Sequence, residues 1–149
     1  MMQNKTPRQQ DLRKGRFSQN NQIYHITTNT LKRLPIFLSF DMARIMVSVL
    51  KQSDALNHTQ TLAFVVMPDH IHWLFQLNLN QTLATLIQSV KSVSAHTLGQ
   101  TIWQAGYYDH AIRKDEDVRG IARYIIANPV RAGLVKKVGD YPHWDAVWI

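Results

Sequence analysis

Residues 65–75 read VVMPDHIHWLF, and this stretch predicts the centre of the fold. A continuous apolar run over residues 61–67 has the length of a buried strand, Pro68 and Asp69 interrupt it, and residues 70–77 resume a strand-like composition. The two runs are predicted to form a hairpin or two adjacent strands. Because alternate side chains of a strand share a face, His70 and His72 project together. Two imidazoles in an apolar run need polar partners, so the same stretch is the first candidate for a functional site.

The flanking segments predict an alternation of strands and helices. Alternating apolar and polar residues indicate strands, and apolar residues at spacings of three and four indicate helices. In chain order, the predicted elements are a strand from residue 23 (IYHITTNT), a helix over residues 41–52 with Asp41 as its cap or first-turn acid, the two hairpin strands, a helix over residues 82–98, an extended segment over residues 102–112 and a helix over residues 114–128. Thr82 is the expected cap of the second helix and Gly99 lies near its end, while Pro129 closes the third helix. This order predicts an α+β fold, an antiparallel sheet with helices packed on one face, as in split βαβ (ferredoxin- or RRM-like) sandwiches.

Length and composition fit one globular domain. The chain has 149 residues, of which 45% are hydrophobic and 18% charged. No apolar run has the roughly 18 to 20 residues that a membrane span needs, and the polar, basic N-terminus is unlike a secretory signal. We therefore expect a cytoplasmic protein, with residues 1–21 forming a flexible basic arm and residues 22–149 a single domain.

The charge balance and the absence of cysteine limit the classes of function that the chain can have. With 17 Lys and Arg against 10 Asp and Glu the net charge is +7, which favours a nucleic-acid partner without proving one. The chain has no cysteine, so disulfides, thiolate zinc sites and cysteine nucleophiles are excluded. Any metal must therefore bind nitrogen and oxygen ligands.

Two pairs of residues could together carry metal chemistry. His70 and His72 can hold one divalent ion, which would polarise a phosphodiester. Tyr124 and Asn128 are spaced i, i+4, so they share one helix face; a tyrosine hydroxyl can act as a nucleophile and an asparagine oxygen as a third ligand. From spacing alone, the structural interpretation is favoured, in which Tyr124 lies at the helix margin and Asn128 caps the helix before Pro129.

Three motifs resemble a known family. MPDHIH (residues 67–72), IWQAGYYDHAIR (residues 102–113) and ARYIIANPVRAGLV (residues 122–135) resemble the REP-associated tyrosine transposases, a branch of the HUH single-tyrosine transposases. The likeness extends from Tyr24 to the segment at Tyr141, and it is specific because the three motifs occur in the family's order and separation.

The resemblance implies a site, a cofactor and a substrate. His70 and His72 correspond to the metal-ligand histidines, Tyr124 to the catalytic nucleophile, and Asn128 to a third polar ligand. The implied fold is the α+β HUH fold, with the tyrosine helix lying across the histidine strand. The implied activity is Mg²⁺- or Mn²⁺-dependent cleavage of single-stranded DNA beside palindromic hairpins, which leaves a 5′-phosphotyrosine on the enzyme and a free 3′-OH. By the same analogy we expect a monomer acting at the nucleoid, with a dimer as the alternative.

Further residues are candidates for holding DNA. The basic candidates for phosphate contacts are Arg16, Arg33, Lys91, Arg113, Arg123, Arg131, Lys136 and Lys137. The aromatic candidates for stacking on unpaired bases, for each of which core packing is the favoured role, are Trp73, Trp103, Tyr107 and Tyr108. The remaining histidines have no spacing argument and are expected to be structural, with His110 worth testing; they include His25, His96, His110 and His143.

Three other functions remain open at this stage. One is the dimeric transposase of an active insertion sequence, with exchanged tyrosine helices. Another is a hairpin DNA- or RNA-binding module without catalysis, and the third is a histidine-dependent hydrolase of small phosphate esters.

Overall fold

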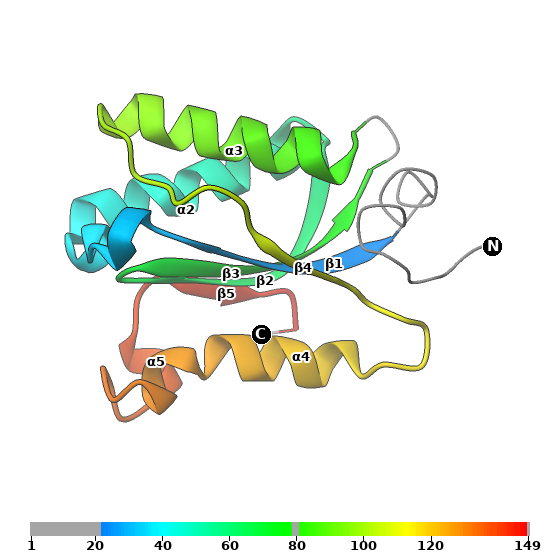
Figure 1. Ribbon diagram of the computed structural model, residues 1–149. Coiled ribbons are helices and arrows are strands. Elements are labelled where there is room, and N and C mark those ends of the chain that lie inside the picture. The colour runs from blue at the N-terminus through cyan, green and yellow to red at the C-terminus, as the bar shows by residue number, and fades with distance from the viewer. Residues whose placement is uncertain (1–21, 79–80, 149) are drawn as a thin grey trace.

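A computed structural model describes residues 22–78 and 81–148 of the protein (Figure 1). The strands are β1 (Ile23–Asn29), β2 (Thr59–Met67), β3 (His70–Leu77), β4 (Tyr108–Ala111) and β5 (Trp144–Ala146). The helices are α2 (Phe40–Ala55), α3 (Leu83–Leu98), α4 (Val118–Ile126) and α5 (Asn128–Arg131), with short 3-10 helices at Leu31–Arg33, Ile36–Leu38 and Val138–Asp140. The arm expected at residues 1–21 lies outside the described residues.

The strands form one antiparallel sheet in the order β4-β1-β3-β2-β5. The predicted hairpin is present as β2 and β3, in which Met67 pairs with His70 across the turn at Pro68 and Asp69. β3 is the central strand, and its other neighbour is β1, where Thr27 lies opposite His72 and Asn29 opposite His70. The histidines therefore lie in the middle of the sheet.

Helices cover both faces of the sheet. α2 and α3 lie on one face, whereas α4 and α5 lie on the other (Figure 1). The predicted α+β fold with an antiparallel sheet is confirmed, but the expectation of helices on one face is corrected to two. The reason is visible in β2, where Phe64 and Val66 enter the core below α2 and Val65 and Met67 enter the core below α4. A stretch of strand that is apolar at every position, as residues 62–67 are, must be covered on both sides.

Local sequence explains where the helices begin. Ser39 accepts a hydrogen bond from the Met42 N–H at 3.3 Å and caps α2, so the expected Asp41 is a first-turn acid instead. Thr82 caps α3 as predicted, and Gly99 ends it with a left-handed φ of 74°. Asp117 caps α4 through the Gly120 N–H at 3.0 Å.

Two elements were not predicted from the sequence. α4 ends at Ile126, and the chain continues as the separate short helix α5, which contains Pro129. β5 is only three residues long and pairs with the outer edge of β2 through Ala146 and Ala63. No helix within residues 22–78 and 81–148 is long and apolar enough to cross a membrane.

Candidate active site on the histidine strand

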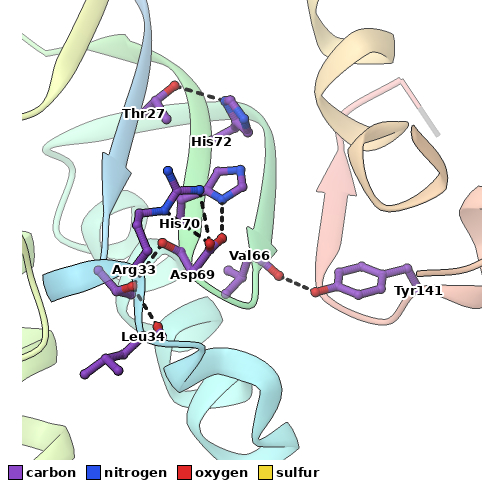
Figure 2. A network of polar contacts seen from close by, with 9 residues as sticks. Thr27, Arg33, Leu34, Val66, Asp69, His70, His72 and Tyr141 are labelled. Atoms are coloured by element: carbon purple, nitrogen blue, oxygen red, sulfur yellow. Dashed lines mark hydrogen bonds and ion pairs between the residues drawn. The ribbon is translucent and has the colours of Figure 1, made fainter. Parts of the chain in front are cut away.

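The two strand histidines project from β3 toward the face that α4 covers. His70 and His72 occupy the positions that alternate with Ile71, which is fully buried in the core on the α2 side. Their rings meet edge to face with centroids 5.1 Å apart. The prediction that the pair shares one face is therefore confirmed by the geometry (Figure 2).

Asp69 orients His70. The His70 Nδ1 atom lies 2.7 Å from a carboxylate oxygen of Asp69, and since a carboxylate only accepts, Nδ1 carries the proton. The second oxygen of Asp69 pairs with Arg33 at 3.1 Å (Figure 2). Burial opposes ionisation of Asp69, but the hydrogen bond and charge of His70, with those of Arg33, more than offset it, so its pKa is lowered. The Nε2 edge of His70 is left free for a ligand.

The loop after β1 holds this arrangement in place. The backbone N–H of Thr30 donates to the Asp69 carbonyl at 3.0 Å, and its hydroxyl lies 2.7 Å from the Leu34 carbonyl and 3.1 Å from the Asp69 carbonyl. Lys32 and Arg33 both have a φ of 55°, a left-handed conformation that costs non-glycine residues about 1–2 kcal/mol each. The fold maintains this strain where Arg33 pairs with Asp69, which is typical of functional loops.

His72 has a different environment, built by β1. Its Nδ1 atom lies 3.0 Å from the Thr27 hydroxyl and 3.0 Å from Nε2 of His25. Burial, followed by the positive charges of His70, His25 and Arg131, lowers the pKa of His72 to about 3. The ring is therefore neutral at ordinary pH, which is the form that binds metal.

His25 is a site residue that the sequence did not reveal. It was expected to be structural, yet it stands beside His72 because the antiparallel register of β1 and β3 brings the strands together. Burial, and then the charge of His110, lowers its pKa. The only signal in the sequence was its alternation with Thr27 on one face of the predicted strand.

A groove beside the histidine strand is lined by His25, His110 and Tyr124. It has a volume of about 470 Å³ between the β1–β4 edge and α4, and its lining residues are His25, His110, Glu116, Asp117, Gly120, Ile121 and Tyr124. On its wall, Nε2 of His110 lies 3.0 and 3.1 Å from the two carboxylate oxygens of Glu116. Burial opposes ionisation of Glu116, but bonds from the Arg113 backbone and His110 lower its pKa, so this wall is acidic.

Tyr124 is an exposed residue that lines this groove. The residue is 58% exposed, and its hydroxyl has no hydrogen-bond partner among the described residues. Asn128, four residues further on, is half-buried at the first position of α5. The cap of α4 is Ala127, so Asn128 is not the cap that the structural interpretation expected.

Two imidazoles are the nitrogen ligands available for a metal. The described residues contain no group of three or more His, Asp or Glu side chains gathered to hold an ion. His70, however, has the carboxylate partner that typically orients a ligating histidine, and His72 is neutral with its Nδ1 engaged. The histidines therefore fit a divalent ion whose remaining ligands are oxygens from an amide, a phosphate or water.

The basic candidates are distributed over several elements and engaged differently. Lys91 donates to the carbonyls of Gln104 and Gly106, and burial lowers its pKa, so it holds a loop of its own chain. Arg113 and Arg123 are exposed and pair with Asp115 at 3.4 Å and Asp117 at 3.6 Å. Arg33 pairs with Asp69 and Arg131 stacks on Tyr124, and the Asp117 that pairs with Arg123 also lines the groove. Arg16 lies outside the described residues, and Lys136 and Lys137 are exposed.

The aromatic candidates differ in how deeply they are buried. Trp73 is fully buried and donates to Thr61, and Trp103 is 9% exposed in the same core, so both pack as expected. Tyr107 is partly buried against that core. Tyr108 is 67% exposed on β4 and is the aromatic candidate open to a base.

Comparison with known proteins identifies the family. Residues 18–128, which contain both strand histidines, Tyr124 and Asn128, match the family described as "Transposase IS200 like". The chain belongs to this family, and the predicted resemblance is confirmed.

Within this family, the chain is similar to REP-associated tyrosine transposases. One of Escherichia coli (strain K12) is 37% identical over 82 residues, covering 54% of this chain and 50% of that protein. A protein assigned the same role in Haemophilus influenzae (strain ATCC 51907 / DSM 11121 / KW20 / Rd) is 33% identical over 100 residues, covering 56% of this chain and 57% of that protein. The matches thus span about half the length of these relatives.

A solved structure shows the same fold. The structure of a REP-associated tyrosine transposase bound to a REP hairpin matches with a TM-score of 0.70 and 28% identity, covering 87% of this chain and 79% of that chain.

Proposed function

We propose that this protein is a metal-dependent endonuclease and strand transferase that acts on single-stranded DNA at palindromic hairpins of the REP type. The observation that carries this proposal is that Tyr124 lines the same groove as His25, a neighbour of the candidate metal ligand His72. Family membership and the hairpin bound in the similar structure support the same substrate.

The chemistry is a transesterification. The Tyr124 hydroxyl loses its proton and attacks the phosphorus, forming the tyrosyl–phosphate bond at the 5′ side. The bond from phosphorus to the 3′ oxygen breaks, and this oxygen leaves with the electron pair and takes up a proton. Because the bond energy is kept in the phosphotyrosine, a 3′-OH of another strand can reverse the attack and join the DNA without ATP.

His70, His72 and Asn128 would hold Mg²⁺ or Mn²⁺. When bound, the ion polarises the phosphate and stabilises the leaving oxyanion. Asp69 orients the His70 ring, and Thr27 and His25 fix the His72 ring. Two imidazoles suit Mn²⁺ better than Mg²⁺, which prefers all-oxygen surroundings.

The proposed unit of function is a single domain over residues 22–149, acting as a monomer. α4 packs on the sheet of its own chain, where Ala122, Ile125 and Ile126 enter the core with β2. Both halves of the proposed site therefore come from one chain, which supports a monomer over an exchange of tyrosine helices. The net charge of +7 supports a polyanionic partner.

A denaturing gel tests the proposal. Wild-type protein and Tyr124→Phe are incubated with labelled single-stranded REP hairpins, with Mn²⁺ and with a chelator. We expect a covalent band for wild type with Mn²⁺ only, and none for Tyr124→Phe. Tyr108→Phe is the matched control, since it removes an exposed hydroxyl but keeps the ring, and it should form the band.

Other outcomes would contradict the proposal. A band with Tyr124→Phe would refute the assigned nucleophile. Metal-independent hairpin binding without any band would favour a binding module, and turnover of nucleotide esters by Tyr124→Phe would favour a histidine-dependent hydrolase.

A further inference from the structure

Arg131 contacts Tyr124 at two points. Its guanidinium carbon lies 3.7 Å from the centroid of the Tyr124 ring, and its Nη1 donates a 2.8 Å hydrogen bond to the Tyr124 carbonyl. Tyr124 is in the last turn of α4, where carbonyls lack partners within the helix and the dipole favours a cation. One side chain thus holds both the backbone and the ring of the proposed nucleophile.

The break between α4 and α5 brings Arg131 back over Tyr124. Pro129 has no N–H and cannot continue the hydrogen-bond ladder of α4, so a new short helix begins there. This helix ends at Arg131 and is followed by Gly133, whose φ of 76° suits glycine, and the Leu134 N–H closes the turn onto the Pro129 carbonyl at 2.9 Å. The sequence between the proline and the glycine therefore determines where Arg131 points.

Tyr124 needs such a support. Its side chain is 58% exposed, and its hydroxyl has no partner among the described residues. An exposed ring on a helix surface can change rotamer, whereas in-line attack on phosphorus requires one orientation.

We propose that Arg131 is a positioning residue that clamps Tyr124 for attack, rather than one more contact to the DNA backbone. The inference rests on the proposed function, because it assigns Tyr124 as the nucleophile. The clamp depends on the planar guanidinium, which can stack on a ring and donate to a carbonyl at once. A lysine ammonium would keep the charge but could not do both.

Two measurements test the clamp. The first is the single-turnover rate of adduct formation at saturating hairpin, with hairpin affinity and its salt dependence measured separately. For Arg131→Ala we expect the rate to fall about tenfold to a hundredfold, the size of effect that a misplacement of about 1 Å produces. For Arg131→Lys we expect a fall of about tenfold, with the salt dependence of binding changed by less than one phosphate contact.

The second measurement needs neither metal nor DNA. In protein labelled with 3-fluorotyrosine, the ¹⁹F resonance of Tyr124 is assigned by its loss in Tyr124→Phe. It should shift in Arg131→Ala and Arg131→Lys. Arg44→Ala is the matched control, since Arg44 also donates to a backbone carbonyl, that of Pro142 at 2.9 Å, and should change neither rate nor resonance.

The outcomes separate this inference from the proposed function. Full recovery of the rate in Arg131→Lys, or a loss confined to hairpin affinity, would identify a simple phosphate contact and overturn the clamp. An unchanged ¹⁹F resonance in Arg131→Ala would also overturn it. If wild type forms no adduct, the proposed function fails, while the ¹⁹F spectra still decide whether Arg131 holds the ring.

Discussion

Replacing Asp69 by asparagine should weaken Mn²⁺ binding without unfolding the site. The substitution keeps the shape of the side chain but removes its charge. In the wild type one carboxylate oxygen accepts from His70 at 2.7 Å and the other pairs with Arg33 at 3.1 Å. The amide of asparagine can accept one hydrogen bond but leaves the His70 ring less basic and Arg33 without an ion pair.

The expected magnitude follows from burial and geometry. The side chains of Asp69 and His70 are 28% and 16% exposed, so their interaction is only partly screened by water. Removing a carboxylate that orients a ligating histidine typically lowers metal affinity by about 10- to 100-fold. This corresponds to about 1.4–2.8 kcal/mol, and we expect the lower end for Asp69→Asn and the upper end for Asp69→Ala.

Isothermal titration with Mn²⁺ measures the affinity, and the metal dependence of adduct formation measures the consequence. Asp115→Asn is the control, because Asp115 pairs with Arg113 at 3.4 Å on the surface with 79% of its side chain exposed. We expect its Mn²⁺ affinity to equal that of wild type. A Mn²⁺ affinity for Asp69→Asn within twofold of wild type would refute the role assigned to Asp69.

Three further predictions concern stability and titration. Burial raises the pKa of Tyr141 to about 12 while its hydroxyl donates to the Val66 carbonyl at 2.6 Å. As the pH rises, Tyr141 therefore ionises in the unfolded chain before it does in the folded protein, so the free energy of unfolding should fall above about pH 10. This pH dependence, measured by urea denaturation at a series of pH values, should be absent in Tyr141→Phe. Burial, and then the charge of Arg44, lowers the pKa of His143, so the free energy of unfolding should fall as the pH drops below about 6.5, the ordinary pKa of histidine. This pH dependence should be absent in His143→Phe. Asp54 accepts hydrogen bonds from the hydroxyls of Thr59 and Thr61 at 2.6 and 2.9 Å and from the Thr61 N–H at 3.1 Å. Asp54→Ala should therefore lower the free energy of unfolding, measured by urea denaturation, by about 2–3 kcal/mol. A loss below about 0.5 kcal/mol would show that these bonds contribute little.

Most of the secondary structure was predictable because its signals are local. The caps at Thr82 and Gly99 and the interruption at Pro68 mark ends that hydrogen bonding within a few residues decides. β5 escaped prediction because its three residues form a strand only by pairing with β2, which lies some eighty positions earlier. The uninterrupted apolar run of β2 indicated that helices cover both faces of the sheet, but the prediction placed helices on one face only.

The residues of the candidate site also differ in whether the sequence could predict their arrangement. The sequence by itself determined that His70 and His72 share a face, since the period of a strand follows from backbone geometry alone. The single helix predicted to carry Tyr124 and Asn128 is divided at Ala127, so Tyr124 belongs to α4 and Asn128 to α5.

Only the tertiary structure decided which side chains support them. His25 reaches His72 through the register of β1 and β3, and Arg131 of α5 reaches Tyr124 of α4 across the break at Ala127. No local period relates His25 to His72, and although residues seven apart can share a helix face, only the folded chain shows that Arg131 stacks on Tyr124.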